Sequence, residues 1–174
     1  MRDIFFSSDP HYDHANILKF TDDRGKKFRG DLFDSVEEMN ETMIERHNSV
    51  VKPTDIWYCL GDVTMRIKGL AAIMSRLNGR KRLLVGNHDD PKNPELTRWF
   101  EKVGIWRLFK DEGFICSHIP LRKDQFRYKV THNLHGHIHQ NLIDEPEYIN
   151  NCMEHINYKP KSMDEIKDQI KRSA

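Results

Sequence analysis

The sequence is organised around one stretch, Asp55-Ile56-Trp57-Tyr58-Cys59-Leu60-Gly61-Asp62. Its apolar run has the length of a strand and ends in Gly-Asp, which predicts a buried strand with a carboxylate at its carboxyl end. Ligand crevices in α/β sheets lie at the carboxyl ends of the strands. We therefore expect Asp62 to point into a crevice above a sheet.

Four further stretches repeat this arrangement, because each has a β-rich run that delivers Asp, His or Asn at its end. They lead into Asp9-Pro10-His11, Asn87-His88-Asp89, His118 and His135-Gly136-His137-Ile138-His139. Five strand ends that carry metal-ligand residue types predict one shared metal centre with Asp62 near its middle.

Most of these clusters also have a structural interpretation when each is taken alone. Asp before Pro commonly opens a turn, Gly-Asn-His-Asp can be a capped turn between a strand and a helix, and a single His118 is more often a partly buried histidine. The triplet His135, His137 and His139 is harder to explain in this way, because period-2 spacing would place all three on one face of a strand. A cation there would relieve their mutual repulsion, so the clusters together favour the metal interpretation.

The candidate ligands mix carboxylate, imidazole and amide groups and include no good thiolate. This set fits Mn²⁺, Fe or Zn²⁺ and argues against Ca²⁺, which takes oxygen ligands. Two ions bridged by one carboxylate would use the whole set, and two-metal sites suit in-line displacement at phosphorus. We expect two divalent ions, Mn²⁺ first, with Fe, Zn²⁺, Ni²⁺ or Mg²⁺ as alternatives. The seven candidates are Asp9, His11, Asp62, Asn87, His118, His137 and His139.

Composition predicts one domain over residues 1–174 with enough apolar side chains, 37%, for a core. The formal net charge of +1 gives no reason to expect strong attraction to nucleic acid or to an anionic membrane, and no run approaches the about 20 apolar residues of a membrane span. Cys59 and Cys116 lie in apolar strand runs, and the three cysteines form no CxxC pair, which is typical of a reducing compartment. We expect a cytoplasmic protein, and the sequence leaves its oligomeric state open.

Strands and helices alternate early in the chain, and strands that pair as hairpins dominate later. We predict strands over 1–9, 56–60, 82–85, 105–110, 113–117, 130–137 and 147–153. Helices are expected over 12–19, from a Ser35–Glu38 capping box to Pro53, over 67–77, from Pro94 to Gly104, and after Ser162. The order favours an α/β fold with a mixed sheet, or with two sheets packed between helices.

The order of the motifs resembles the calcineurin-like metallophosphoesterase superfamily. Its five blocks, D-x-H, G-D, G-N-H-D, a single H and G-H-x-H, occur in sequence between residues 9 and 139. The chain is similar to the compact single-domain branch of prokaryotes and phages, in which Asp-x-His-x-x-His (here ending at His14) and a tail like Asn157-Tyr158-Lys159-Pro160 recur. The resemblance implies a four-layer α/β/β/α sandwich with two mixed β-sheets flanked by helices.

The resemblance also implies a role for each matching residue. Asp62 would bridge two metals, His88 would lie over the phosphate without ligating a metal, Asp89 would orient His88, and His135 would fall outside the ligand set. The first metal would be held by Asp9, His11 and His139, and the second by Asn87, His118 and His137.

The activity implied is hydrolysis of small or nucleotide-like phosphoesters, with phosphodiesters favoured, by attack of a metal-bridging hydroxide. A compact chain without a large cap insertion predicts an open site. A nuclease and a non-catalytic metal-binding scaffold are the alternatives, and the presence of all seven ligands and His88 favours an enzyme. Candidate contacts to the substrate are His14 and Arg122, together with Lys26, Lys27, Arg29 and Lys123.

Overall fold

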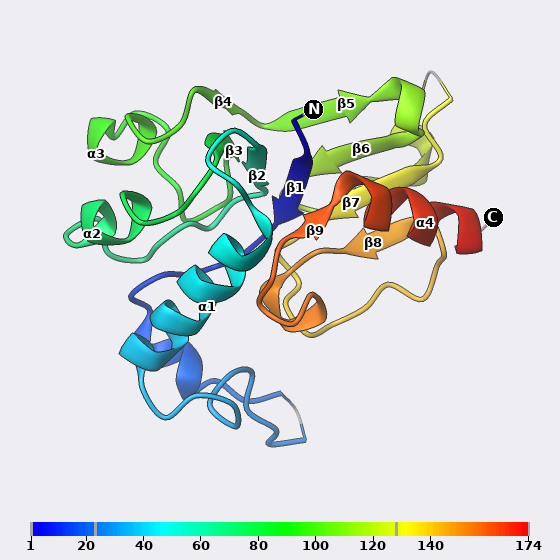
Figure 1. Ribbon diagram of the computed structural model, residues 1–174. Coiled ribbons are helices and arrows are strands. Elements are labelled where there is room, and N and C mark those ends of the chain that lie inside the picture. The colour runs from blue at the N-terminus through cyan, green and yellow to red at the C-terminus, as the bar shows by residue number, and fades with distance from the viewer. Residues whose placement is uncertain (1, 23, 128, 174) are drawn as a thin grey trace.

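The computed structural model describes residues 2–22, 24–127 and 129–173, and within them the chain forms two mixed β-sheets and four α-helices (Figure 1). The helices are α1 (Val36–Val50), α2 (Leu70–Met74), α3 (Pro94–Thr97) and α4 (Met163–Ser173). Short 3-10 helices cover Ala15–Leu18, Lys110–Glu112, Lys123–Gln125 and Met153–His155. Among the described residues, none of the helices has the length and apolar character needed to cross a bilayer.

The first sheet has the strand order β4-β3-β2-β1-β9, in which β1 to β4 are parallel and β9 is antiparallel to β1. Since parallel strands end at the same edge, the residues that follow β1, β2 and β3 meet there. The strands are β1 (Ile4–Ser7), β2 (Ile56–Cys59), β3 (Arg80–Leu84), β4 (Lys102–Gly104) and β9 (Lys161–Ser162).

The second sheet has the order β5-β6-β7-β8, with β6, β7 and β8 parallel to one another. β5 and β6 are antiparallel neighbours joined by a short connection, which confirms the predicted hairpin. The strands are β5 (Trp106–Phe109), β6 (Phe114–Ser117), β7 (His132–His135) and β8 (Tyr148–Asn150).

Two apolar cores hold these layers together. Alternate residues of one strand face opposite sides, so Trp57 joins Met39 and Met43 of α1 in the core under the helices, while Tyr58 faces the other sheet. The core between the sheets contains aromatic side chains in contact, with the Phe6 ring stacked on that of Tyr58 at 5.6 Å between centroids. The predicted α/β fold with two packed mixed sheets is therefore confirmed.

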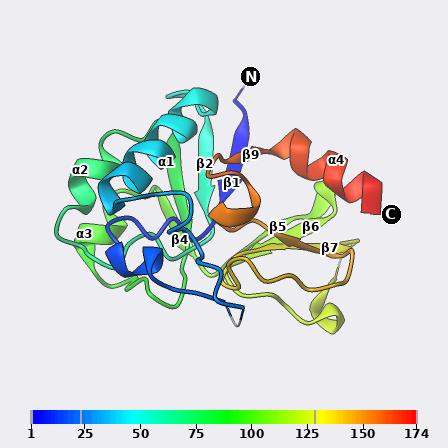
Figure 2. The same cartoon turned by 90° about the horizontal axis from the view of Figure 1, so that it is seen from below.

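The terminal helix α4 lies on the opposite side of β1 and β2 from α1 and α2 (Figure 2). Its Ile166 belongs to the core between the sheets, and its Ser173 hydroxyl lies 3.0 Å from His132 Nε2 of β7. The capping box predicted at the start of this helix is present, because Glu165 N–H donates to Ser162 Oγ and the Glu165 carboxylate accepts from Ser162 N–H.

One predicted helix is much shorter than its sequence pattern indicates. Asn93 caps α3 by accepting from Glu95 N–H, as expected, but the helix ends at Thr97. Val103, which lies within the helix predicted from Pro94 to Gly104, belongs to β4 and pairs with Leu83. Pairing with the edge of β3 outweighs the helical spacing of a few apolar residues, because the ladder satisfies backbone groups of both strands.

Candidate metal centre

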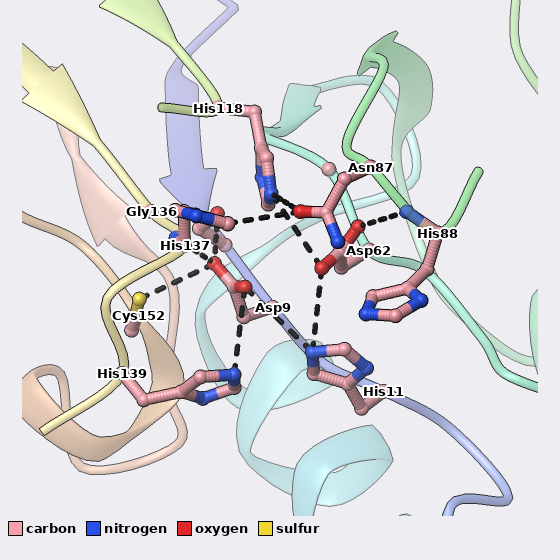
Figure 3. Close-up of polar contacts among 12 residues, drawn as sticks. Asp9, His11, Asp62, Asn87, His88, His118, Gly136, His137, His139 and Cys152 are labelled. Atoms are coloured by element: carbon pink, nitrogen blue, oxygen red, sulfur yellow. Dashed lines mark hydrogen bonds and ion pairs between the residues drawn. The ribbon is translucent and has the colours of Figure 1, made fainter. Parts of the chain in front are cut away.

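Seven side chains predicted as metal ligands converge where the carboxyl ends of β1, β2 and β3 meet those of β6 and β7 (Figure 3). They come from the segments that directly follow these five strands, as the strand-end pattern indicates. The seven are Asp9, His11, Asp62, Asn87, His118, His137 and His139.

Asp9, His11 and His139 form one group with the spacing of ligands to a single cation. Asp9 Oδ1 lies 3.7 Å from His11 Nε2 and 4.0 Å from His139 Nε2. Among the described residues, Asp9 Oδ1 and His11 Nε2 are buried without a hydrogen-bond partner. Buried polar atoms are nearly always paired, so a carboxylate oxygen and an imidazole nitrogen left together fit a bound metal ion.

Asp62 lies between this group and the remaining ligands. Its Oδ2 is 3.6 Å from His11 Nε2 and 3.5 Å from His118 Nε2, an intermediate position that suits a bridging carboxylate. Asp9, Asp62 and His118 also form a group with ligand spacing, so Asp9 as well as Asp62 faces both halves of the centre.

The second half of the centre is built on the side-chain oxygen of Asn87. Its Oδ1 lies 2.9 Å from both His118 Nε2 and His137 Nδ1. His118 Nδ1–H donates to the carbonyl of Leu60 at 2.8 Å, which leaves the lone pair of the neutral ring on Nε2. That lone pair faces oxygen atoms of Asn87 and Asp62, and a cation between them would turn this repulsion into coordination.

Five of the seven candidate ligands have a left-handed backbone. The φ angles are 56° for Asp9, 48° for His11, 55° for Asp62, 72° for His137 and 48° for His139. Each such non-glycine residue costs about 1–3 kcal/mol, and residues of this kind gather at functional sites. Of the nine non-glycine residues with positive φ in the described part of the chain, five are therefore candidate ligands, so backbone strain gathers at the site that the motifs indicate.

The positions of His137 and His139 correct one sequence argument. Strand β7 ends at His135, so the three histidines do not share one face of a strand, and the interpretation from period-2 spacing was wrong. The chain leaves the sheet at Gly136, where a Cβ would overlap Ser8 Oγ and Asp9 Oδ2. Left-handed turns beyond that glycine then carry His137 and His139 to the centre, while His135 stays in β7.

The second oxygen of Asp9 is held by neighbouring groups. Asp9 Oδ2 accepts from Ser8 Oγ at 2.6 Å, from His137 N–H at 2.8 Å and from the Cys152 thiol at 3.2 Å. Burial opposes ionisation of Asp9, but the adjacent His11 and the charges of further imidazoles outweigh it and hold the pKa of Asp9 below its usual range. Burial raises the pKa of Cys152 well above its usual value, so this residue acts as a thiol donor.

A buried ion pair supports the first group of ligands. Arg29 is fully buried, and it donates to Glu154 Oε1 at 2.8 Å and to the carbonyls of Asp9 and Pro10 at 2.6 and 2.8 Å. Glu154 Oε1 also accepts from His139 Nδ1–H at 3.1 Å, which directs the opposite nitrogen of that ring towards Asp9. A carboxylate behind a histidine in this way fixes the tautomer and orientation of a metal ligand.

The charge state of Glu154 follows from the same contacts. Burial opposes its ionisation, but the charge of Arg29 and the hydrogen bond from His139 lower the pKa of Glu154 to about 2. Sequence reasoning missed Glu154, because a lone Glu in a short 3-10 helix carries no motif. It also assigned Arg29 to the substrate, which is wrong, because this guanidinium is enclosed by protein atoms.

The structure separates the roles predicted for His88 and Asp89. His88 is exposed, its ring centroid lies 5.7 Å from that of His11, and its backbone N–H donates to Asp62 Oδ1 at 2.9 Å. Asp89 does not orient His88 as predicted, because its carboxylate accepts from the N–H groups of Asp62, Val63 and Gly86 at 2.8–3.0 Å. Asp89 therefore joins the loops that carry Asp62 and Asn87.

The predicted substrate contacts divide into two groups. His14 lies beside the centre, with its ring centroid 5.7 Å from that of His11, and partial burial followed by the charge of His11 lowers its pKa to about 4. Arg122 and Lys123 are engaged at the surface instead, the first with Asp124 and the second with Glu145 and Glu147. Lys26 and Lys27 are exposed in the loop before α1.

No family model matches this chain. It is 35% identical to the uncharacterized protein MJ1445 of Methanocaldococcus jannaschii, over 99% of this chain and 93% of that protein. It is 34% identical to the Gene 66 protein of Mycobacterium phage L5, over 82% of this chain and 80% of that protein. The chain belongs to the same family as MJ1445 and this phage protein.

The fold is similar to that of AQ665 from Aquifex aeolicus, whose crystal structure is described as that of a protein of unknown function. The TM-score is 0.76 and the sequence identity 26%, over 97% of this chain and 99% of that one. The similarity therefore extends over both sheets.

Proposed function

We propose that this chain is a phosphoesterase of the calcineurin-like type that depends on two divalent metal ions. The observation that carries the proposal is the pair of buried, unpartnered ligand atoms in the described residues, Asp9 Oδ1 and His11 Nε2, beside a second set of nitrogen atoms around Asn87 Oδ1. The proposal includes the fold that the resemblance implies, a four-layer α/β/β/α sandwich of two mixed β-sheets flanked by helices. In this fold α4 packs against the core between the sheets through Ile166 and contacts β7 through Ser173.

The ligands divide between two ions as the resemblance implies. Asp9, His11 and His139 would hold the first ion, and Asp62 would lie between the two. The second ion would be held by Asn87, His118 and His137. Two such ions would supply Lewis-acid activation of water and neutralise charge on the phosphoryl group, with Mn²⁺ as the favoured metal.

His88 would act directly on the substrate. Its imidazole is exposed beside His11, while its backbone is fixed by the hydrogen bond to Asp62, so it can face a phosphate held by the centre. There it would stabilise the negative charge that develops on the phosphoryl oxygens and protonate the leaving alkoxide. A positioned general acid contributes about 10²–10⁴ in rate.

The test combines metal analysis with hydrolysis. We expect two Mn²⁺ per chain and turnover of bis(4-nitrophenyl) phosphate by the loaded protein. Asp62→Asn should lower both the metal content and the turnover, because the central position then loses its charge. Asp124→Asn, the same change in an exposed ion pair, should alter neither. Saturation at one ion, or an Asp62→Asn variant that behaves like the control, would contradict the proposal.

A further inference from the structure

An apolar groove with a volume of about 670 Å³ adjoins the second half of the candidate metal centre. It lies against β5 and β6 and under the loop that follows β6. Leu108 and Ile115 contribute from the strands, and Leu121 and Val130 from the loop. Ile115 alternates with Phe114 and Cys116, which face the core between the sheets, so the groove lies on the outer face of the second sheet.

The rim of this groove presents large apolar side chains to water. Ile105 is 71% exposed, Trp106 58% and Ile119 52%. Exposed apolar area costs about 25 cal/mol per Å², and a concave apolar patch beside polar groups is typical of a ligand site. Small-molecule pockets span about 300–1,000 Å³, and this groove falls within that range.

The groove and the metal centre share two residues. Asn87 and His118 line the groove, and their side chains also form the second half of the centre, with Asn87 Oδ1 2.9 Å from His118 Nε2. A phosphoryl group held by the centre would therefore have one of its ester substituents near the mouth of the groove. We propose that the groove binds an apolar organic group, alkyl or aryl, of the phosphoester substrate, an inference that rests on the proposed function.

Three polar side chains of the groove lining already make hydrogen bonds within the described part of the chain. Ser117 Oγ donates to the carbonyl of Ile119 at 2.7 Å and accepts from Asn133 Nδ2 at 3.0 Å. Arg127 donates to backbone carbonyls of its own loop, and Gln125 Nε2 donates to Asp124 Oδ1 at 3.0 Å. A nucleobase here would lose hydrogen bonds to water and could replace them only through the groups that these side chains leave free, at about 1–3 kcal/mol for each group that stays unpaired. An alkyl or aryl group loses none.

The inference can be tested with phosphonates, which the enzyme cannot hydrolyse. Binding of methyl-, butyl-, hexyl- and phenylphosphonate to the Mn²⁺-loaded protein is measured by calorimetry. Each buried methylene contributes about 0.8 kcal/mol, so Kd should fall about fourfold per methylene along the alkyl series. The double variant Trp106→Ser/Leu121→Asn should flatten this series while it keeps the affinity for methylphosphonate.

The matched control is Leu32→Asn, which makes the same kind of change at a residue that is 63% exposed and does not line the groove. This variant should keep the full dependence on chain length. If methylphosphonate binds but the series is flat in the unmodified protein, the inference is overturned and the proposed function stands. If methylphosphonate does not bind, both are overturned.

Two further outcomes would also overturn the inference. Adenosine 5′-monophosphate that binds more tightly than hexylphosphonate would assign the groove to a nucleoside. Sedimentation that shows a dimer, dissociated in the double variant, would identify a second copy of the chain as the occupant. The inference is supported if the unmodified protein and the double variant are both monomers, and if Kd depends on the length of the phosphonate's alkyl chain only in the unmodified protein.

Discussion

Glu154→Gln should destabilise the protein far more than removal of one surface carboxylate. The change keeps the size of the side chain but leaves the guanidinium of Arg29 buried without its charge partner. Breaking a buried ion pair from one side costs about 3–5 kcal/mol. The carbonyls of Asp9 and Pro10 still accept from Arg29, so we expect a loss near the lower end of this range.

The chain offers a matched control in the ion pair between Arg76 and Glu41. Both of these side chains are about half exposed, at 49% and 60%. Glu41→Gln is chemically the same change, but it should cost far less stability, because water solvates the charge that remains on the exposed Arg76. Urea unfolding of both variants without added metal measures the difference in the free energy of unfolding.

A second comparison separates the buried charge from the packing of the side chains. In Arg29→Met/Glu154→Gln the unpaired charge is gone, so the double variant should be more stable than the sum of the two single losses predicts. Metal affinity should also fall about 10–100-fold in Glu154→Gln, because His139 loses the carboxylate that orients it. A loss no larger than that of Glu41→Gln, or strict additivity of the two changes, would refute this account of the ion pair.

Three further predictions concern other parts of the chain. His88→Ala should keep two Mn²⁺ per chain while kcat falls about 10²–10⁴-fold, less for good leaving groups, and loss of a metal ion would contradict its assignment. Gly86→Ala should lower the melting temperature strongly, because its Cβ would overlap the Asp62 carboxylate, whereas Gly104→Ala meets no atom closer than 3.9 Å and should be tolerated. Burial lowers the pKa of His47 from 6.5 to about 4. Between these pH values the imidazole therefore binds a proton in the unfolded state but stays largely neutral in the folded state. Stability should therefore fall by up to about 3 kcal/mol as the pH drops from 6.5 to 4. Chemical unfolding across this range should show a shallower pH dependence in His47→Gln, and equal slopes would argue against the shift.

Sequence reasoning located most of the candidate centre because the strand ends are local signals. An apolar run followed by Gly-Asp or Gly-Asn is visible in a few residues, and the parallel order of β1, β2 and β3 then brings Asp9, Asp62 and Asn87 to one edge. The contacts behind these ligands are not local. Arg29 and Glu154 are 125 positions apart, so no local sequence pattern predicts that they form a pair.

The left-handed ligands show why the centre depends on the whole fold. Each loop alone would relax from a positive φ, because the cost is intrinsic to a residue with a Cβ. Here the loops bond one another: Asp9 N–H donates to Gly61 O and His11 N–H to Asp62 O, each at 3.0 Å, while His137 N–H donates to Asp9 Oδ2 at 2.8 Å. The segments after β1, β2 and β7 thus hold one another in strained conformations that none would keep alone. It follows that the candidate ligands are positioned by folding, and that a bound metal would stabilise an arrangement which the backbone hydrogen bonds have already built.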